Sequence, residues 1–146
     1  GYIVVKLGAS KTAEILSKTL EANEARGRRK FVRATCPPGV ALAYLDIDGK
    51  NFRAEVSDLS SAGCALRFDD ALVCKPGTIL RGLQLNIKGV RVLADGFVAA
   101  KRDEGDRPTH IVMFAPASLD EERRDKIRNL VFKLNQANME KLLASI

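Results

Sequence analysis

Between residues 40 and 115, apolar and polar side chains alternate in several short runs. A period of two is typical of β-strands that bury one face. The predicted strands cover residues 40–44, 52–56, 64–68, 83–87, 90–92, 97–100 and 111–114. The turn signals between them include Asp48-Gly49, Pro76-Gly77 and Lys88-Gly89. This mainly β pattern predicts a six- or seven-stranded antiparallel barrel, with the polar residues 102–108 as a hairpin loop.

A helical period of apolar residues follows the predicted barrel. Ser118 and Glu121 have the spacing of a capping box, which marks the start of a helix. The apolar stripe of this helix consists of Ile127, Leu130, Val131 and Leu134. We therefore predict a helix over residues 118–144 whose stripe packs on its own barrel or, as the alternative, on a partner.

The first 25 residues have a different pattern. Residues 2–6 are predicted to form a short strand, and Ser10 can cap a helix that ends near Ala25. We interpret residues 1–25 as an N-terminal extension or the end of a preceding module, since the chain starts at Gly1 without a methionine. Residues 26–146 form the second predicted unit, with the barrel reaching to about residue 117.

Positive charge is concentrated where the two predicted units meet. The formal net charge is +6, and the cationic segment contains no acidic residue: Arg26, Arg28, Arg29, Lys30 and Arg33. The remaining basic residues of the chain nearly balance its 18 acidic ones. Such a distribution favours a small anionic partner over a long polyanion that would cover a whole face.

The composition excludes several other classes of protein. A chain of 146 residues with 46% hydrophobic content can bury one core, and no apolar run reaches the roughly 18 residues that span a bilayer. Cys36, Cys64 and Cys74 show no CxxC spacing, so we expect neither disulfides nor a metal site. A cytoplasmic location and buried thiols are the expectation.

We expect no catalytic residues. His110 is the only histidine and lies in a predicted strand, where a structural role is the simplest interpretation. No P-loop or HExxH motif occurs. Asp46 and Asp48 flank a turn and are more simply turn formers than an acid–base pair.

Two arginines of the cationic segment, Arg29 and Arg33, form an RxxxR motif. Each guanidinium can grip a phosphate or the O6 and N7 atoms of guanine through two hydrogen bonds. In an extended segment both side chains would project to one side. Taken alone, the motif is more simply interpreted as a solvated basic tail.

A second motif, DxSxxG, follows the predicted strand 52–56 and comprises Asp58, Ser60 and Gly63. The Asp58 carboxylate can accept from N1 and N2 of guanine, and Ser60 can donate to a phosphate oxygen. Gly63 permits a positive φ or a close backbone approach. The alternative is a hairpin turn that these residues merely shape.

The order and spacing of RxxxR and DxSxxG resemble the PilZ domain family, over about residues 26–140. The resemblance implies a PilZ-type β-barrel with a closing C-terminal helix and cyclic di-GMP as the ligand, with no further cofactor. Arg29 and Arg33 would bind guanine and phosphate, and Asp58, Ser60 and Gly63 would form the barrel side of the site. An arginine at position 28 is associated in the family with two stacked copies of the dinucleotide.

The resemblance further implies a bacterial second-messenger sensor that signals through a downstream protein or other domains of a longer chain. Ligand binding would change the orientation of the N-terminal segment. A PilZ-fold adaptor without a ligand is one alternative. A small barrel that binds single-stranded nucleic acid is another, but only 5% of the chain is aromatic. We expect the phenylalanines of the predicted strands in the core instead: Phe52, Phe68, Phe97 and Phe114.

Overall fold

The computed structural model describes residues 32–70 and 72–145. The first three strands are β1 (Arg33–Thr35), β2 (Ala41–Ile47) and β3 (Lys50–Ser60). Next come β4 (Gly63–Phe68), β5 (Ile79–Ile87), β6 (Val90–Glu104) and β7 (Arg107–Phe114). A 3₁₀ turn (Pro116–Ser118) leads into the helix α2 (Glu121–Ala144). The strand predicted at residues 2–6 and the helix predicted at 10–25 lie outside the described residues.

The strands form an antiparallel sheet in the order β1-β3-β2-β5-β6-β7-β4, and β4 also pairs with β3. This last pairing closes β2 to β7 into a six-stranded barrel, and β1 is an extra strand on β3. The predicted barrel is therefore confirmed. Alternate residues of each strand point inward, so that Ala54 and Val56 of β3 are buried with Leu66 and Phe68 of β4.

Two predictions about β6 were wrong. Residues 90–92 and 97–100 belong to one strand of 15 residues, because Asp95-Gly96 does not turn the chain. Gly96 is instead buried close to the backbone of β7. The continuous strand places Phe97 on the face opposite Val98, and Phe97 is 43% exposed rather than in the core. The other three phenylalanines are buried as predicted.

The predicted loop at residues 102–108 is mostly strand. Pairing between β6 and β7 continues from Arg102, opposite Thr109, to Glu104, opposite Arg107. Only Gly105 and Asp106 turn, with φ of +65° at Gly105. The sequence of residues 102–108 has no alternation of apolar and polar residues, so it is also typical of a loop. The two strands pair here through their backbones, which does not require such an alternation.

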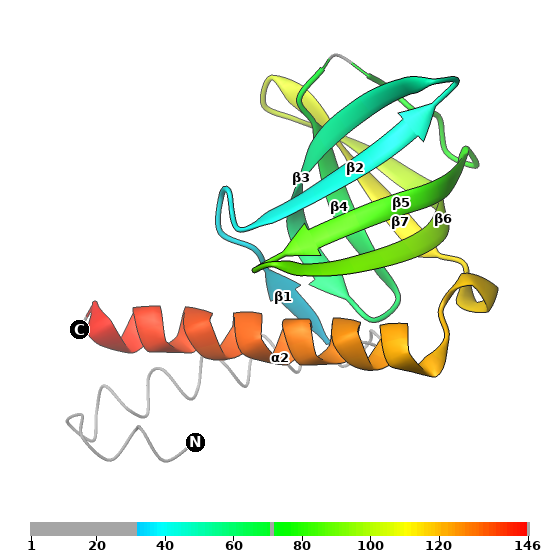
Figure 1. Cartoon of the computed structure of the whole chain (residues 1–146). Coiled ribbons are helices and arrows are strands. Elements are labelled where there is room, and N and C mark those ends of the chain that lie inside the picture. The colour runs from blue at the N-terminus through cyan, green and yellow to red at the C-terminus, as the bar shows by residue number, and fades with distance from the viewer. Residues whose placement is uncertain (1–31, 71, 146) are drawn as a thin grey trace. The chain divides into compact units, whose positions relative to one another are not determined.

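Helix α2 crosses one end of the barrel, and β1 lies between the barrel and the helix (Figure 1). The predicted stripe of Ile127, Leu130, Val131 and Leu134 is buried, so it packs on its own barrel. The predicted cap was wrong: Asp120, not Ser118, accepts from the backbone N–H of Arg123. Ser118 instead donates to the carbonyl of Ala115 and accepts from the backbone N–H of Asp95.

Two asparagines of α2 attach the helix to β1. Asn135 Nδ2 donates to the carbonyl of Arg33 at 3.3 Å, and Asn138 Nδ2 donates to the carbonyl of Thr35 at 2.8 Å. On its other edge, the residue after β1 donates a backbone hydrogen bond to β3, from Cys36 N to Ser57 O at 2.8 Å. The three-residue strand is thus held along both edges.

The backbones of β4 and β7 approach each other closely at Gly63. This residue lies opposite Met113, and a Cβ atom on it would overlap the carbonyl oxygen of Val112. No positive φ is involved. Of the two reasons for a glycine considered from the sequence, the close approach is the correct one.

We expect Gly63→Ala to lower the free energy of unfolding by about 1–3 kcal/mol, because an overpacked methyl group must push two paired strands apart. Urea denaturation measures this. Ser61→Ala, in the same turn at a half-buried position, is the matched control and should be close to native. A Gly63→Ala variant as stable as this control would contradict the argument.

His110 lies in β7 with its side chain fully buried. Its Nε2 accepts a hydrogen bond of 2.9 Å from the backbone N–H of Cys74, and its ring forms a T-shaped pair with the ring of Phe68, with centroids 5.3 Å apart. Nδ1 has no hydrogen-bond partner among the described residues. Burial, and secondarily the charge of Lys101, lowers the pKa of His110. The folded state therefore favours the neutral imidazole of His110 over the protonated one.

The lowered pKa of His110 predicts a pH-dependent stability. Below the ordinary pKa of about 6.5 the unfolded chain takes up a proton that the folded chain resists, so the free energy of unfolding should fall as the pH drops below that value. Denaturant titrations at a series of pH values measure the slope. His110→Gln cannot titrate at this position and should have a flatter profile; equal slopes in both proteins would contradict the expectation.

Candidate functional site

The pairing of β1 with β3 brings part of RxxxR beside DxSxxG. Arg33 lies opposite Ser60, and Thr35 lies opposite Asp58. Because Cys36 donates to Ser57 across the same two strands, both of these pairs are of the non-hydrogen-bonded kind. Facing side chains come closest in such pairs. Arg33 and Asp58 thus emerge on the same face of one short ribbon.

Asp58 borders a surface pocket of about 370 Å³. The Asp58 carboxylate is half-buried, and the hydroxyl of Thr35 lies 3.5 Å from its Oδ1 as a long hydrogen-bond donor. The other polar side chains that line the pocket come from β3, β4 and β7: Glu55, Ser57, Arg67 and Thr109. The pocket size falls within the range of about 300–1,000 Å³ that is usual for ligand sites.

Ser60 organises the turn between β3 and β4. Its Oγ accepts from the backbone N–H groups of Ala62 and Gly63 at 3.1 and 3.2 Å, and it donates to the carbonyl of Gly63 at 3.3 Å. The side chain is buried. A ligand phosphate that accepts from Ser60 would therefore have to replace the bond to Gly63.

Of the arginines predicted to bind the ligand, Arg33 is described and is half-buried in β1. Arg28 and Arg29 lie outside the described residues. The structure thus brings Arg33, Asp58, Ser60 and Gly63 into one neighbourhood around the β1–β3 ribbon and the β3–β4 turn.

The cysteines are buried and unpaired, as predicted. Cys36 borders the pocket, where burial, and secondarily the negative charge of Asp58, raises the pKa of its thiol to about 12. Burial also raises the pKa of the thiols of Cys64 and Cys74. A thiol with so high a pKa stays protonated and is a poor nucleophile.

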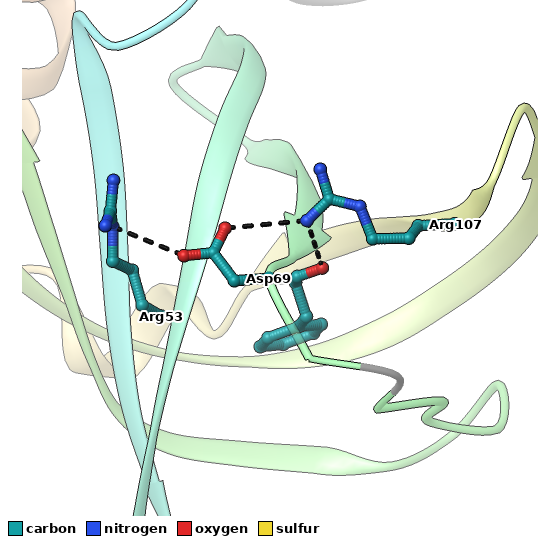
Figure 2. Close-up of polar contacts among 4 residues, drawn as sticks. Arg53, Asp69 and Arg107 are labelled. Carbon is teal, nitrogen blue, oxygen red and sulfur yellow. Dashed lines mark hydrogen bonds and ion pairs between the residues drawn. The ribbon is translucent and has the colours of Figure 1, made fainter.

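An ion-pair network lies on the neighbouring part of the barrel. Asp69 bridges Arg53 of β3 and Arg107 of β7, each at 3.5 Å, and Arg107 also donates to the carbonyl of Phe68 at 2.9 Å (Figure 2). Both guanidinium groups are therefore paired with Asp69, the residue that follows β4.

Sequence reasoning missed five polar residues of the pocket: Thr35, Glu55, Ser57, Arg67 and Thr109. Thr35 lies two residues after Arg33 in an extended segment, which was a usable signal for a shared face. Arg67 alternates with the buried Leu66 and Phe68, so its outward direction could be predicted. Its proximity to Asp58 could not, because it depends on the register of β3 against β4.

The part of the chain that the structure describes contains no cluster of three or more metal-ligating side chains. No helix in this part is long and apolar enough to cross a membrane.

Several solved structures have the same fold at low sequence identity. The PilZ domain with c-di-GMP of YcgR from Escherichia coli is 17% identical, with a TM-score of 0.67 over 79% of this chain and 97% of that one. YcgR in complex with c-di-GMP, also from Escherichia coli, is 16% identical with a TM-score of 0.70 over 82% of this chain. The MrkH–c-di-GMP complex of K. pneumonia is 20% identical with a TM-score of 0.65 over 78% of this chain. The present chain spans 51% and 55%, respectively, of the two latter chains.

A search of curated proteins finds no match to the sequence. The sequence profile of the PilZ domain, by contrast, matches residues 27–133, which include both motifs, all seven strands and the first half of α2. Since this match covers most of the chain and the barrel agrees with it, the chain belongs to the PilZ domain family.

Proposed function

We propose that this chain is a cyclic di-GMP receptor domain that acts in the cytoplasm and signals through protein contacts. PilZ domains are receptors and not enzymes. The observation that carries the proposal is the register of β1 against β3, in which Arg33 faces Ser60 and Thr35 faces Asp58. The structures of the YcgR PilZ domain with c-di-GMP and of the MrkH–c-di-GMP complex support it.

In the proposed complex, guanine is recognised by charge-assisted hydrogen bonds. Asp58 accepts from N1 and N2 of the base, a pair of donors that adenine lacks. Arg33, with Arg28 and Arg29 from the cationic segment, binds phosphate and the O6 and N7 atoms of a guanine of the dinucleotide. Ser60 and Gly63 contribute through the turn that they shape, with Ser60 able to exchange its bond to Gly63 for one to a phosphate.

The proposed output is a change in the orientation of the segment before β1. Binding draws the arginines of that segment toward the barrel, and the direction in which the chain enters β1 is then fixed by the ligand. A downstream protein, or other domains of a longer chain, would read this change. An arginine at position 28 also favours two stacked dinucleotides per chain, because it adds a cation for the doubled phosphate charge.

We expect cyclic di-GMP to bind with a dissociation constant near the micromolar range, which corresponds to a binding free energy of about −8 kcal/mol. Arg33→Ala should weaken binding by roughly 5- to 150-fold, the equivalent of about 1–3 kcal/mol for one bidentate contact. Isothermal titration calorimetry measures affinity and stoichiometry together. The substitution leaves the backbone carbonyl that accepts from Asn135 in place, so β1 should stay attached to α2.

Arg91→Ala is the matched control for this titration. It removes the same charge from an exposed position in β6, opposite Asn86, where no motif residue lies. The control should bind like the native chain. If the native chain gives no heat of binding, the receptor proposal fails and the PilZ-fold adaptor becomes the better account.

The proposed reorientation predicts a local change in hydrogen exchange. With saturating cyclic di-GMP, the backbone amides of residues 26–33 should exchange more slowly, because the ligand fixes the arginines of this segment on the barrel. Mass spectrometry of proteolytic fragments measures the rates. Amides of β5, in the barrel wall, serve as the internal reference; equal exchange at residues 26–33 with and without ligand would disprove the reorientation but not the binding.

A further inference from the structure

The pocket beside Asp58 contains charged residues that belong to neither motif. Glu55 of β3 and Arg67 of β4 lie directly opposite each other, and both line the pocket. They alternate with the buried residues Val56 and Leu66, so both point away from the core. Opposed residues on neighbouring strands have Cβ atoms about 5 Å apart, so these two side chains share one part of the pocket wall.

The charge of the pocket wall depends on Arg67. Asp58 and Glu55 are its acidic lining residues, and Arg67 is the one cationic residue among the described residues that line it. Without Arg67 the wall would carry two carboxylates and no compensating charge. A nucleotide that carries phosphates would then be repelled from the pocket that holds the carboxylate meant to recognise its base.

The guanidinium of Arg67 is also available. Within residues 32–70 and 72–145 it makes no hydrogen bond and no ion pair, although its side chain is half-buried. Arg53 and Arg107 on the adjacent strands are instead committed to Asp69, as Figure 2 shows. Arg67 is therefore positioned in the pocket without a structural task of its own.

Guanine chemistry gives this arginine a definite partner. On the guanine ring, O6 is bonded to the carbon next to N1, and N7 follows along the same edge. A base whose N1 and N2 donate to Asp58 consequently presents O6 and N7 to a neighbouring side of the pocket. Arginine is the side chain that most commonly binds these two acceptors together.

We propose that Arg67 is a further ligand-binding residue, which holds the O6 and N7 edge of the guanine whose N1 and N2 bind Asp58. This inference rests on the proposed function and refines it. The barrel alone then reads one guanine with two fixed charged groups, while the cationic segment is left to bind phosphate and the second base. Specificity for guanine over adenine arises at Arg67 as well as at Asp58, because adenine carries an amino donor in place of O6.

The test compares the native chain with Arg67→Ala, Arg67→Lys and the control Arg91→Ala by isothermal titration calorimetry. Cyclic di-GMP and cyclic di-AMP are the two ligands. We expect Arg67→Ala to bind cyclic di-GMP roughly 5- to 150-fold more weakly than the native chain. Arg67→Lys, which keeps the charge but not the planar fork, should recover only part of the loss. The preference for cyclic di-GMP over cyclic di-AMP should be smaller in Arg67→Ala and in Arg67→Lys than in the native chain.

The outcomes separate the inference from the proposed function. Native-like affinity for cyclic di-GMP in Arg67→Ala, with the native chain binding, would overturn the role of Arg67 and leave the receptor proposal intact. An equal loss for both ligands would overturn the base-reading role, since a charge effect alone would explain it. No binding by the native chain would overturn both. Circular dichroism checks the fold, and Arg67→Lys carries the test if the alanine variant does not fold.

Discussion

The pairing of β1 with the last residues of β3 is the interaction on which the site depends. It is a ribbon of only three residue pairs, yet it sets Arg33 against Ser60 and Thr35 against Asp58. Three residue pairs provide too few hydrogen bonds to hold an isolated strand in water. The strand persists because two carboxamides of α2 bind its outer edge, so the C-terminal helix indirectly defines the geometry of a site near the N-terminal end of the domain.

The DxSxxG residues have structural tasks that precede any ligand. Ser60 satisfies two backbone donors of the β3–β4 turn, and Gly63 lets β4 lie close against β7. Asp58 is different, because its carboxylate borders an open pocket. The motif therefore combines two residues that shape the backbone, Ser60 and Gly63, with one whose side chain can contact a ligand, Asp58. Loss of binding after substitution of Ser60 or Gly63 does not by itself identify a ligand contact, whereas loss after substitution of Arg33 or Arg67 does so more directly.

The alternation of residues such as Phe52, Ala54 and Val56 was sufficient to predict a barrel, because burying one face of each strand leaves a period of two in the sequence. It was not sufficient for β6. Asp95-Gly96 is typical of a turn, yet Asp95 accepts from the backbone N–H of Gly82 and Gly96 packs under β7. These contacts are made with neighbouring strands, so no local pattern in the sequence indicates them.

The motifs of the candidate site could be found in the sequence, whereas their arrangement in space could not be predicted from it. RxxxR and DxSxxG could be found as motifs, and their chemistry indicated guanine and phosphate. That Arg33 faces Ser60 could not be read from the sequence, since β1 is held by Asn135 and Asn138 from the far end of the domain. Arg67 was missed because its position relative to Asp58 depends on the register of β3 against β4, which shifts at a bulge in β3.

The two asparagines that bind β1 also limit how this domain can meet another protein. β1 is the one described strand that adds to the outside of the closed barrel. The two outward carbonyls of β1 are already occupied by side chains of α2. No strand of a partner can therefore extend the described sheet at β1 without first displacing α2. A partner that did displace α2 would at the same time release the strand that carries Arg33.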